Sequence, residues 1–373
     1  MHSECRALPS YIYEVICLLT LSIASVWHTV WPILVAILLF GVVIFIHECG
    51  HFFFAKLFGV KVNEFAIGFG PTLFKFGKGE TTYSLRLLPF GGFCSMEGED
   101  EESDNAGAFG KKPVWKRLVI VVAGAMNNLI LGLILVGVLL AMSGSYVTRE
   151  FTYFSDDAMS ESTGLMLGDE ILKIDGRSIY CATDISYMLM NSRDASVDMV
   201  VRRDGIKTEL DDVTFRTQEV EGRHIIELDF KVVGKKVSIT QPFAFIKEAF
   251  LETVSLGRLV WMSLFDIVTG RYGLNEIMGP VGIINETGKA ITMGLENVLY
   301  IIALLTVNLG IMNLLPIPAV DGGRIVFLVI EGIRRKPVPA KYEGWVHGIG
   351  LILLLLLSVL IMGNDIWRLI RGG

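Results

Sequence analysis

Four long apolar stretches constrain the fold of this chain most strongly. They run from about Trp31 to Phe54, Leu118 to Met142, Val298 to Leu315 and Val346 to Met362. A helix of about 20 apolar residues is long enough to cross a bilayer. Helices and closed barrels are the structures that satisfy every backbone hydrogen bond in lipid. The sequence therefore predicts a polytopic α-helical membrane protein with four core transmembrane helices.

The composition agrees with several membrane spans joined to a water-exposed module. The chain is 52% hydrophobic and 19% charged, which is too apolar for a soluble domain and too interrupted for a bare helix bundle. A net charge of −6 provides no basic field for nucleic acid, so no nucleic-acid partner is expected. Five scattered cysteines without a CxxC pair argue against a disulfide scaffold or a cysteine-based zinc site.

The sequence between the second and third spans has two parts. The first alternates apolar and polar residues over short runs separated by Gly, Asp and Asn, which predicts a small β-rich domain. In the second, Phe243–Val268 has helical periodicity but is interrupted by charged residues, which favours a helix lying along the membrane interface. The predicted division is an unassigned apolar leader (1–30), the first two spans with their loop (31–145), the β-rich domain (146–236), the interfacial segment (237–296) and the last two spans (297–373).

Lysine and arginine gather in two connections and set the expected orientation. One connection joins the first two spans, and the other, from Arg324 to Lys341, joins the last two. The positive-inside rule places both connections on the cytoplasmic side. Both termini and the β-rich domain are then expected outside the cytoplasm.

The first apolar stretch ends in IHECGHFFFAKLFG, which contains an HExxH motif. On a helix, His47 and His51 share one face, and Glu48 can reach a water molecule held beside them. Catalytic zinc has three protein ligands and an open position for water. The alternative is a chance match, or polar residues that bind a neighbouring helix. Ionisable residues inside a membrane segment are unfavourable and mark function by default, so we predict a zinc site.

A third zinc ligand is expected far along the chain, in NLLPIPAVDGG at 313–323. The positions at which a downstream histidine ligand could follow the motif hold Phe54 and Leu57. Pro316 and Pro318 end the third span, and Asp321 follows on the cytoplasmic side. The histidine pair lies ~24 Å along the first span from Trp31, at a matching depth near the cytoplasmic face. The alternative is that Asp321 caps an ordinary helix-exit turn.

Residues 65–88 contain two β-prone runs around FGKGE, with Tyr83, Leu85 and Leu87 alternating with polar residues. This pattern predicts a hairpin that dips into the membrane edge. An exposed strand edge could hold a substrate in extended form by strand addition. A hairpin that merely packs over the site is an equally good interpretation of the pattern.

Several motifs together resemble the site-2 protease family, and more closely its bacterial RseP/RasP-type regulated intramembrane zinc metalloproteases. They are HECGH, NLLPIPAVDGG, LLPFGGFCSMEGE, WKRLVIVVAGAMNN and MGPVGI. The resemblance implies that His47, His51 and Asp321 are ligands of Zn²⁺ and that Glu48 is the catalytic glutamate. It also implies that Asn313 contacts the substrate or polarises its carbonyl group. Cys49 departs from the aliphatic residue that is usual in the family, and we expect it to pack rather than to bind metal.

The resemblance extends to the parts around the site. It favours substrate presentation by the hairpin, which makes Tyr83, Leu85 and Leu87 candidate substrate-binding residues. Asn127 and Asn128 of the second span are expected to hydrogen-bond inside the bundle, with substrate contact as the alternative. The segment STGLMLGDEILKIDGRSI at 162–179 resembles a bacterial PDZ domain. Such a domain could bind peptide tails or exclude bulky substrates, and we favour exclusion.

The predicted function is that of a zinc-dependent intramembrane endopeptidase in the bacterial inner (cytoplasmic) membrane. Its expected partners are the lipid bilayer and a single-pass transmembrane substrate, of the anti-sigma factor or signal-peptide-remnant type. An upstream site-1-type protease is expected to trim that substrate first. The alternatives are a catalytically inactive membrane PDZ scaffold and a metal or ion transporter.

Overall fold

The computed structural model describes residues 10–371 except 78, 100, 193, 221–222, 238 and 271–276, with side chains described from Val30 onward apart from a few further gaps. The chain divides into two compact units. One contains α1, the β1–β2 sheet, α6, α9, the starts of α2 and α7 and the second half of α8. The other contains the β-rich segment, α5, most of α2 and α7 and the first half of α8.

The prediction of four apolar spanning helices is confirmed in the described part of the chain. Each of the four has a stretch that is long and apolar enough to cross a membrane, with mean hydropathy from 1.8 to 2.6. The first begins upstream of its predicted start, because the backbone from Ser10 onward continues into it as one helix. The helices are α1 (Ser10–Leu57), α2 (Val114–Ser143), α7 (Leu295–Leu314) and α9 (Ala340–Arg371).

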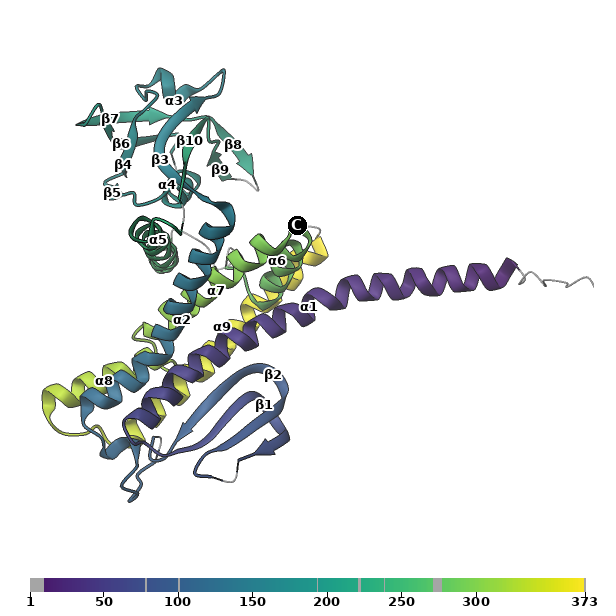
Figure 1. Cartoon of the computed structure of the whole chain (residues 1–373), viewed down its shortest axis with the longest axis vertical. Helices are drawn as coiled ribbons and strands as arrows, with labels where there is room; N and C mark the ends of the chain where they lie inside the picture. Colours follow the sequence, from purple (N-terminus) through teal and green to yellow (C-terminus); the bar gives the residue numbers. More distant parts are fainter. Residues whose placement is uncertain are drawn as a thin grey trace, which may run out of the picture. The chain divides into compact units, whose positions relative to one another are not determined.

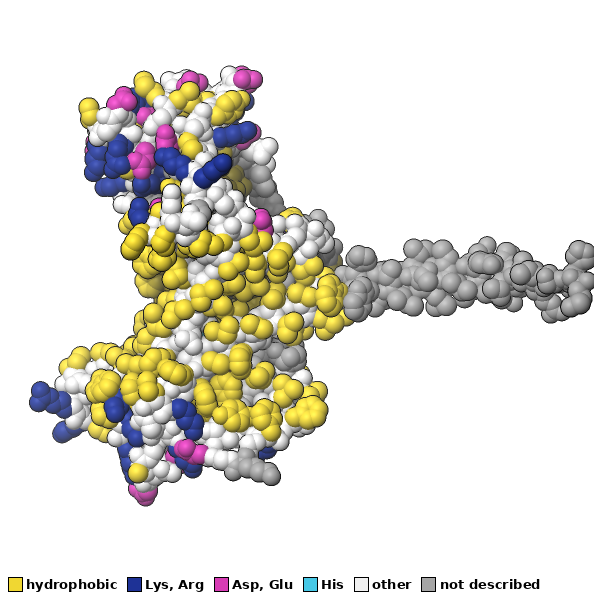
Figure 2. Space-filling model, in the orientation of Figure 1, with side chains coloured by type: hydrophobic (Ala, Val, Ile, Leu, Met, Phe, Trp, Pro, Cys, Tyr) yellow, Lys and Arg dark blue, Asp and Glu magenta, His cyan; other side chains and the backbone are white. Residues whose placement is uncertain are grey.

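These helices expose apolar side chains. The exposed fractions of Leu38 on α1, Ile134 on α2 and Leu360 on α9 are 65%, 57% and 68%. Figure 2 shows apolar side chains covering the helical parts, while many of the charged side chains gather over the β-rich segment. Apolar patches of this extent are stable in a hydrocarbon environment and would aggregate in water. The helices are therefore suited to lipid contact.

The predicted hairpin is a sheet of two long strands, β1 (Val62–Phe76) and β2 (Thr82–Met96), beside α1 (Figure 1). Each strand bends and contributes two segments. The first segment of β1, 62–67, pairs with 92–96 on one side and with 82–85 on the other. The second segment of β1, 72–76, pairs with 83–86. The order across the sheet is therefore 92–96, 62–67, 82–86 and 72–76. Among the described residues, the edges of this sheet are therefore 72–76 and 92–96.

The β-rich segment forms a six-stranded sheet and a separate hairpin. The sheet order is β10-β3-β4-β6-β7, with the short β5 on β4, and β8 pairs with β9. Its core includes Phe151, Ile171 and Met199, which are at most 1% exposed. The elements are β3 (Ser145–Phe154), α3 (Met159–Ser162), β4 (Glu170–Ile174), β5 (Arg177–Ser178), α4 (Ala182–Met190), β6 (Ser196–Arg203), β7 (Ile206–Thr214), β8 (Thr217–Val220), β9 (Arg223–Ile226) and β10 (Phe230–Lys236).

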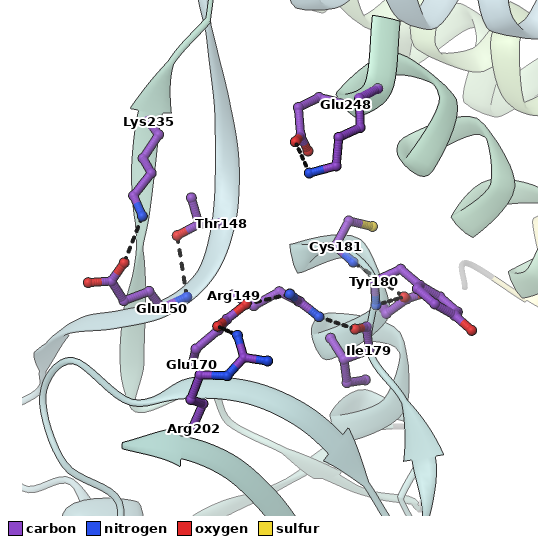
Figure 3. Close-up of polar contacts among 12 residues, drawn as sticks. Thr148, Arg149, Glu150, Glu170, Ile179, Tyr180, Cys181, Arg202, Lys235 and Glu248 are labelled. Carbon is purple, nitrogen blue, oxygen red and sulfur yellow. Dashed lines mark hydrogen bonds and ion pairs between the residues drawn. The ribbon is translucent and has the colours of Figure 1, made fainter. Parts of the chain in front are cut away.

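Ion pairs join neighbouring strands on the surface of this sheet (Figure 3). Glu170 on β4 accepts hydrogen bonds from Arg149 on β3 and, at 2.6 Å, from Arg202 on β6. Lys235 on β10 donates to Glu150 on β3 at 2.9 Å. Opposite charges on neighbouring strands favour this strand pairing, and these exposed pairs agree with the strand order.

Three further helices complete the fold, namely α5 (Pro242–Val268), α6 (Pro280–Met293) and α8 (Asp321–Arg334). Helix α5 coincides with the predicted amphipathic helix. Its Ala249 and Leu256 form a small core with Val136 of α2 and Val307 of α7. Helix α8 lies in the connection between the last two spans, which the sequence predicts only as a loop.

Candidate metal centre

His47 and His51 lie one turn apart near the end of α1, and both are buried, with exposed fractions of 6% and 7%. Their Nε2 atoms are 3.2 Å apart. The rings meet edge to face, with centroids 4.8 Å apart. The helical spacing therefore places both imidazole nitrogens at one point, as the HExxH motif predicts.

The backbone of α2 orients one of these rings. The Nδ1 atom of His51 lies 2.9 Å from the carbonyl oxygen of Ile120. A carbonyl only accepts hydrogen bonds, so Nδ1 carries the proton and Nε2 keeps its lone pair. This arrangement fixes the tautomer that a metal-binding histidine needs, with a carbonyl as the outer partner.

Asp321 is brought to the site by a turn between two helices. Helix α7 ends at Leu314, Ala319 adopts a positive φ of 75°, and α8 begins at Asp321. A ligand atom from each of His47, His51 and Asp321 lies within 4.8 Å of the others. The sequence offered this third residue as a candidate, and it lies 270 positions beyond His51.

This donor set fits a zinc ion. Zn–N bonds of about 2.0–2.1 Å in tetrahedral geometry place two ligand nitrogens about 3.3 Å apart, close to the 3.2 Å between the two Nε2 atoms. Two imidazoles and one carboxylate are three of the ligands that zinc prefers, and the fourth position remains for water. The group is buried or half-buried, so the ligands are shielded from competing solvent.

Glu48 lies on α1 between the two histidines and is half-buried. The β1–β2 sheet reaches it at Gly92: a Cβ atom built on Gly92 would lie 3.5 Å from Cγ of Glu48 and 2.7 Å from the carbonyl oxygen of Ala66. Gly92 belongs to the edge segment 92–96. The catalytic candidate is thus adjacent to a sheet edge.

The asparagine candidates occupy different positions. Asn313 is half-buried in the last turn of α7, eight residues before Asp321. Asn128 of α2 is fully buried, and its carbonyl oxygen accepts a hydrogen bond of 3.1 Å from the hydroxyl of Thr306 on α7. Asn127 is half-buried. The backbone of Asn128 therefore has a packing role between two helices.

Tyr83, Leu85 and Leu87 lie on β2, but the first two are not on a sheet edge. Tyr83 pairs with both Phe65 and Phe76. Tyr83 and Leu85 lie on an inner segment of the sheet because β1 and β2 each fold back and enclose it, and substrate binding by Tyr83, Leu85 and Leu87 stays a prediction. Leu85 and Leu87 expose 39% and 52% of their surface, whereas Ser84, between Tyr83 and Leu85, is buried.

A comparison with protein families decides the class. Residues 35–357 match the profile of peptidase family M50, which includes the site-2 proteases. The chain belongs to family M50. This confirms the resemblance found in the motifs, and the match covers most of the chain and all the candidate site residues.

Relatives of this M50 protein give the activity. It is 38% identical to protein CPE1693 of Clostridium perfringens, which carries a provisional zinc-metalloprotease name, over 90% of this chain and 98% of the relative. It is 30% identical to the regulator of sigma-W protease RasP of Bacillus subtilis, over 89% and 97% of the two chains. The zinc metalloprotease RasP of Shouchella clausii is 29% identical, over 90% and 99%. The chain is a zinc metalloprotease of the membrane, and Zn²⁺ is its cofactor.

Two features of this M50 site are not among the sequence-based expectations. The carbonyl of Ile120 is a backbone group, and every residue carries one. The edge position of Gly92 follows from the bends of β1 and β2. The two adjacent glycines in LLPFGGFCSME could have drawn attention to Gly92, since paired glycines often mark a close backbone approach.

Proposed function

We propose that this M50 protein is an intramembrane endopeptidase that cleaves the transmembrane segments of single-pass membrane proteins. The observation that carries the proposal is the grouping of His47 and His51, near the end of α1, with Asp321, which follows the end of α7. Both α1 and α7 are apolar enough to cross a bilayer. A metal site in such a position can act on peptide bonds that a soluble protease does not reach.

The roles of the residues follow from their chemistry. His47, His51 and Asp321 hold the zinc ion, which when bound lowers the pKa of a coordinated water to about 7 and polarises a peptide carbonyl. Glu48 accepts the proton of the attacking water and passes it to the leaving amide nitrogen. The side-chain amide of Asn313 donates a hydrogen bond to the oxygen that becomes negative. The carbonyl of Ile120 keeps His51 in one tautomer and orientation.

The edge segment 92–96 presents the substrate. A helix shields its peptide bonds, so the substrate has to be extended before cleavage. An extended peptide can add to a free strand edge through backbone hydrogen bonds, and Gly92 places this edge beside Glu48. Phe93 and Cys94 on this segment are then closer to the substrate than Tyr83 and Leu85.

The β-rich domain at 146–236 acts as a PDZ-like size filter outside the cytoplasm. Gly168, with a positive φ of 87°, and the buried Asp169 form its GD turn, in which Asp169 pairs with Arg203 at 2.8 Å. Helix α4 of this domain packs against α5: Asp184 accepts hydrogen bonds from Ser255 at 2.6 Å and Arg258 at 3.3 Å. Because α5 already covers one face of α4, steric exclusion is favoured over peptide binding there.

The natural setting is the bacterial inner membrane, with the site near the cytoplasmic face. An upstream protease trims the substrate outside the cell before this enzyme cleaves it. The name of the B. subtilis relative, a regulator of sigma-W protease, favours an anti-sigma factor over a signal-peptide remnant as the substrate class.

The test uses full-length protein purified in detergent and a transmembrane peptide with a fluorescent reporter. Glu48→Gln should retain one zinc per chain and lose cleavage, because only the proton acceptor is removed. Glu102→Gln, at an exposed glutamate of the loop between α1 and α2, is the matched control and should cleave normally. Cleavage by Glu48→Gln at the normal rate would refute the mechanism.

The rival functions give different results in the same assay. A scaffold would bind the peptide and release no product from any variant. A transporter would move metal across vesicle membranes. Substitution of His47 or His51 would abolish that transport, whereas Glu48→Gln would leave it unchanged. Either result, with no cleavage by the unaltered protein, would contradict the proposal.

A further inference from the structure

Arg117, in the first turns of α2, forms a buried ion pair with Glu331 near the end of α8. Two of its guanidinium nitrogens bind the two carboxylate oxygens of Glu331, one of them at 3.0 Å. The side chains are only 10% and 15% exposed. The third nitrogen, Nε, donates to the carbonyl oxygen of Lys112 at 3.0 Å. All three nitrogens of the guanidinium therefore have fixed partners.

This geometry restrains orientation as well as position. A bidentate pair between a planar guanidinium and a carboxylate fixes direction, which a single charge contact does not. Breaking a buried pair by removing one partner leaves an uncompensated charge, so the pair strongly favours a single arrangement. A second contact lies beside it: a Cβ atom on Gly332 of α8 would lie 3.7 Å from Val114 of α2.

Helix α8 connects this pair to the metal site. Asp321 is the first residue of the helix and Glu331 lies ten residues later, a rise of about 15 Å. Much of α8 is half-buried or exposed along its length, so packing alone restrains its rotation weakly. The pair at its far end therefore sets the rotation of the helix that carries the carboxylate ligand.

The same turns of α2 also contact α1. The carbonyl of Ile120 accepts a hydrogen bond from His51, and Trp115 packs edge-on against Phe58, the residue after α1, with ring centroids 5.4 Å apart. One short segment, residues 114–120, thus contacts the helix that bears the histidine ligands and the helix that begins with the aspartate ligand.

We propose that Arg117 and Glu331 are positioning residues for zinc, which hold α8 so that Asp321 meets the two histidines. The inference rests on the proposed zinc site of His47, His51 and Asp321. Neither residue touches the substrate or the metal. Their contribution is to reduce the freedom of one ligand relative to the other two.

The experiment measures zinc affinity of the full-length protein in detergent by competition with a chelator. Arg117→Gln and Glu331→Gln should each weaken zinc binding by about 10–100-fold, the range typical of outer-shell partners of metal ligands. Arg117→Lys keeps the charge without the bidentate geometry and should give a smaller loss. The control is Arg334→Gln, an exposed arginine of the same helix, which should bind zinc normally.

Replacing zinc by cobalt gives a measurement that would not change if Arg117 only stabilised the fold. The visible spectrum of bound Co²⁺ reports the geometry of its ligands, so Arg117→Gln should change its band positions and not only its occupancy. The exchanged pair, Arg117→Glu with Glu331→Arg, restores opposite charges and should recover part of the zinc affinity. The exchanged pair also tests the positioning role if the single variants fail to fold.

The outcomes separate this inference from the proposed site. Asp321→Ala should lose zinc; if it binds zinc normally, the proposed site is wrong. If Asp321→Ala loses zinc while folded Arg117→Gln keeps both zinc affinity and the Co²⁺ spectrum, the site is right and the positioning role is refuted. An exchanged pair that folds but recovers no zinc affinity would also refute it.

Discussion

Gly322 lies against the carbonyl group of Leu315 so closely that a Cβ atom on Gly322 would be 1.8 Å from that oxygen. Real contacts of this kind are at least about 3.3 Å, so no residue with a side chain fits here without moving the backbone. The turn from the end of α7 into α8 is closed by this approach. The same turn determines the position of Asp321, the residue before Gly322.

Gly322→Ala should therefore disrupt the metal site. The added methyl group forces Leu315 and the start of α8 apart, so we expect zinc affinity to fall by at least about tenfold, as for other losses of support to a ligand. The measurement is chelator competition. Gly348→Ala is the control, because a Cβ atom there meets nothing within 4 Å and alanine favours helix. Normal zinc binding by Gly322→Ala would contradict this account of the turn.

Gly92→Ala tests the edge segment beside Glu48. A Cβ atom there would lie 2.7 Å from the carbonyl oxygen of Ala66, so the edge must shift away from its neighbour and from the catalytic residue. We expect cleavage to fall by about tenfold or more with zinc retained, since a displacement of about 1 Å can cost a hundredfold in rate. Gly79→Ala, in open space in the same sheet's loop, is the matched control. Loss of zinc together with cleavage would instead assign Gly92 a structural role.

Cys94 provides a pH-dependent prediction. Burial, and next the negative charge of Glu48, raise the pKa of the Cys94 thiol to about 12. The thiolate is the reactive form, so alkylation by iodoacetamide should rise about tenfold per pH unit from pH 7 to pH 10 without a plateau. In the unfolded chain the same thiol should plateau above its ordinary pKa of about 8.5. Peptide mass spectrometry measures the alkylation rate of Cys94 in the folded and in the unfolded chain. If the rate in the folded protein stopped rising near pH 9, the burial of Cys94 would be contradicted.

The contact between the β-rich domain and α5 depends on a buried hydrogen bond. Ser255 and Asp184 are both fully buried, and the hydroxyl donates to the carboxylate at 2.6 Å. Ser255→Ala should weaken this contact by about 1.5–3 kcal/mol, the usual range for a hydrogen bond to a charged group. This energy corresponds to an acceleration of amide hydrogen exchange in α4 and α5 by about 10- to 150-fold, while zinc stays bound. Ser162→Ala, at an exposed serine, should leave both exchange rates unchanged.

Parts of the fold and site could be predicted from the sequence because their signals are local. Apolar runs of sufficient length predict spanning helices wherever they pack, and His47 and His51 share a helix face because of their spacing alone. The prolines after Leu314 predict the end of α7, as the structure has it. Asp321 could be offered as a ligand from the turn that follows and from the expected depth of the two helices.

The sequence therefore determined the four spans, the helical histidine pair with Glu48 between them, and the chemical class of the site. Tertiary structure alone decided that segment 92–96 of β2, and not the segment of the same strand that bears Tyr83, forms the sheet edge beside Glu48. It also decided that the Ile120 carbonyl orients His51 and that Arg117 binds Glu331, 214 positions away. The physical reason is that periodicity reports the face of one element, whereas a sheet edge or a carbonyl partner depends on which other elements the folded chain places beside it.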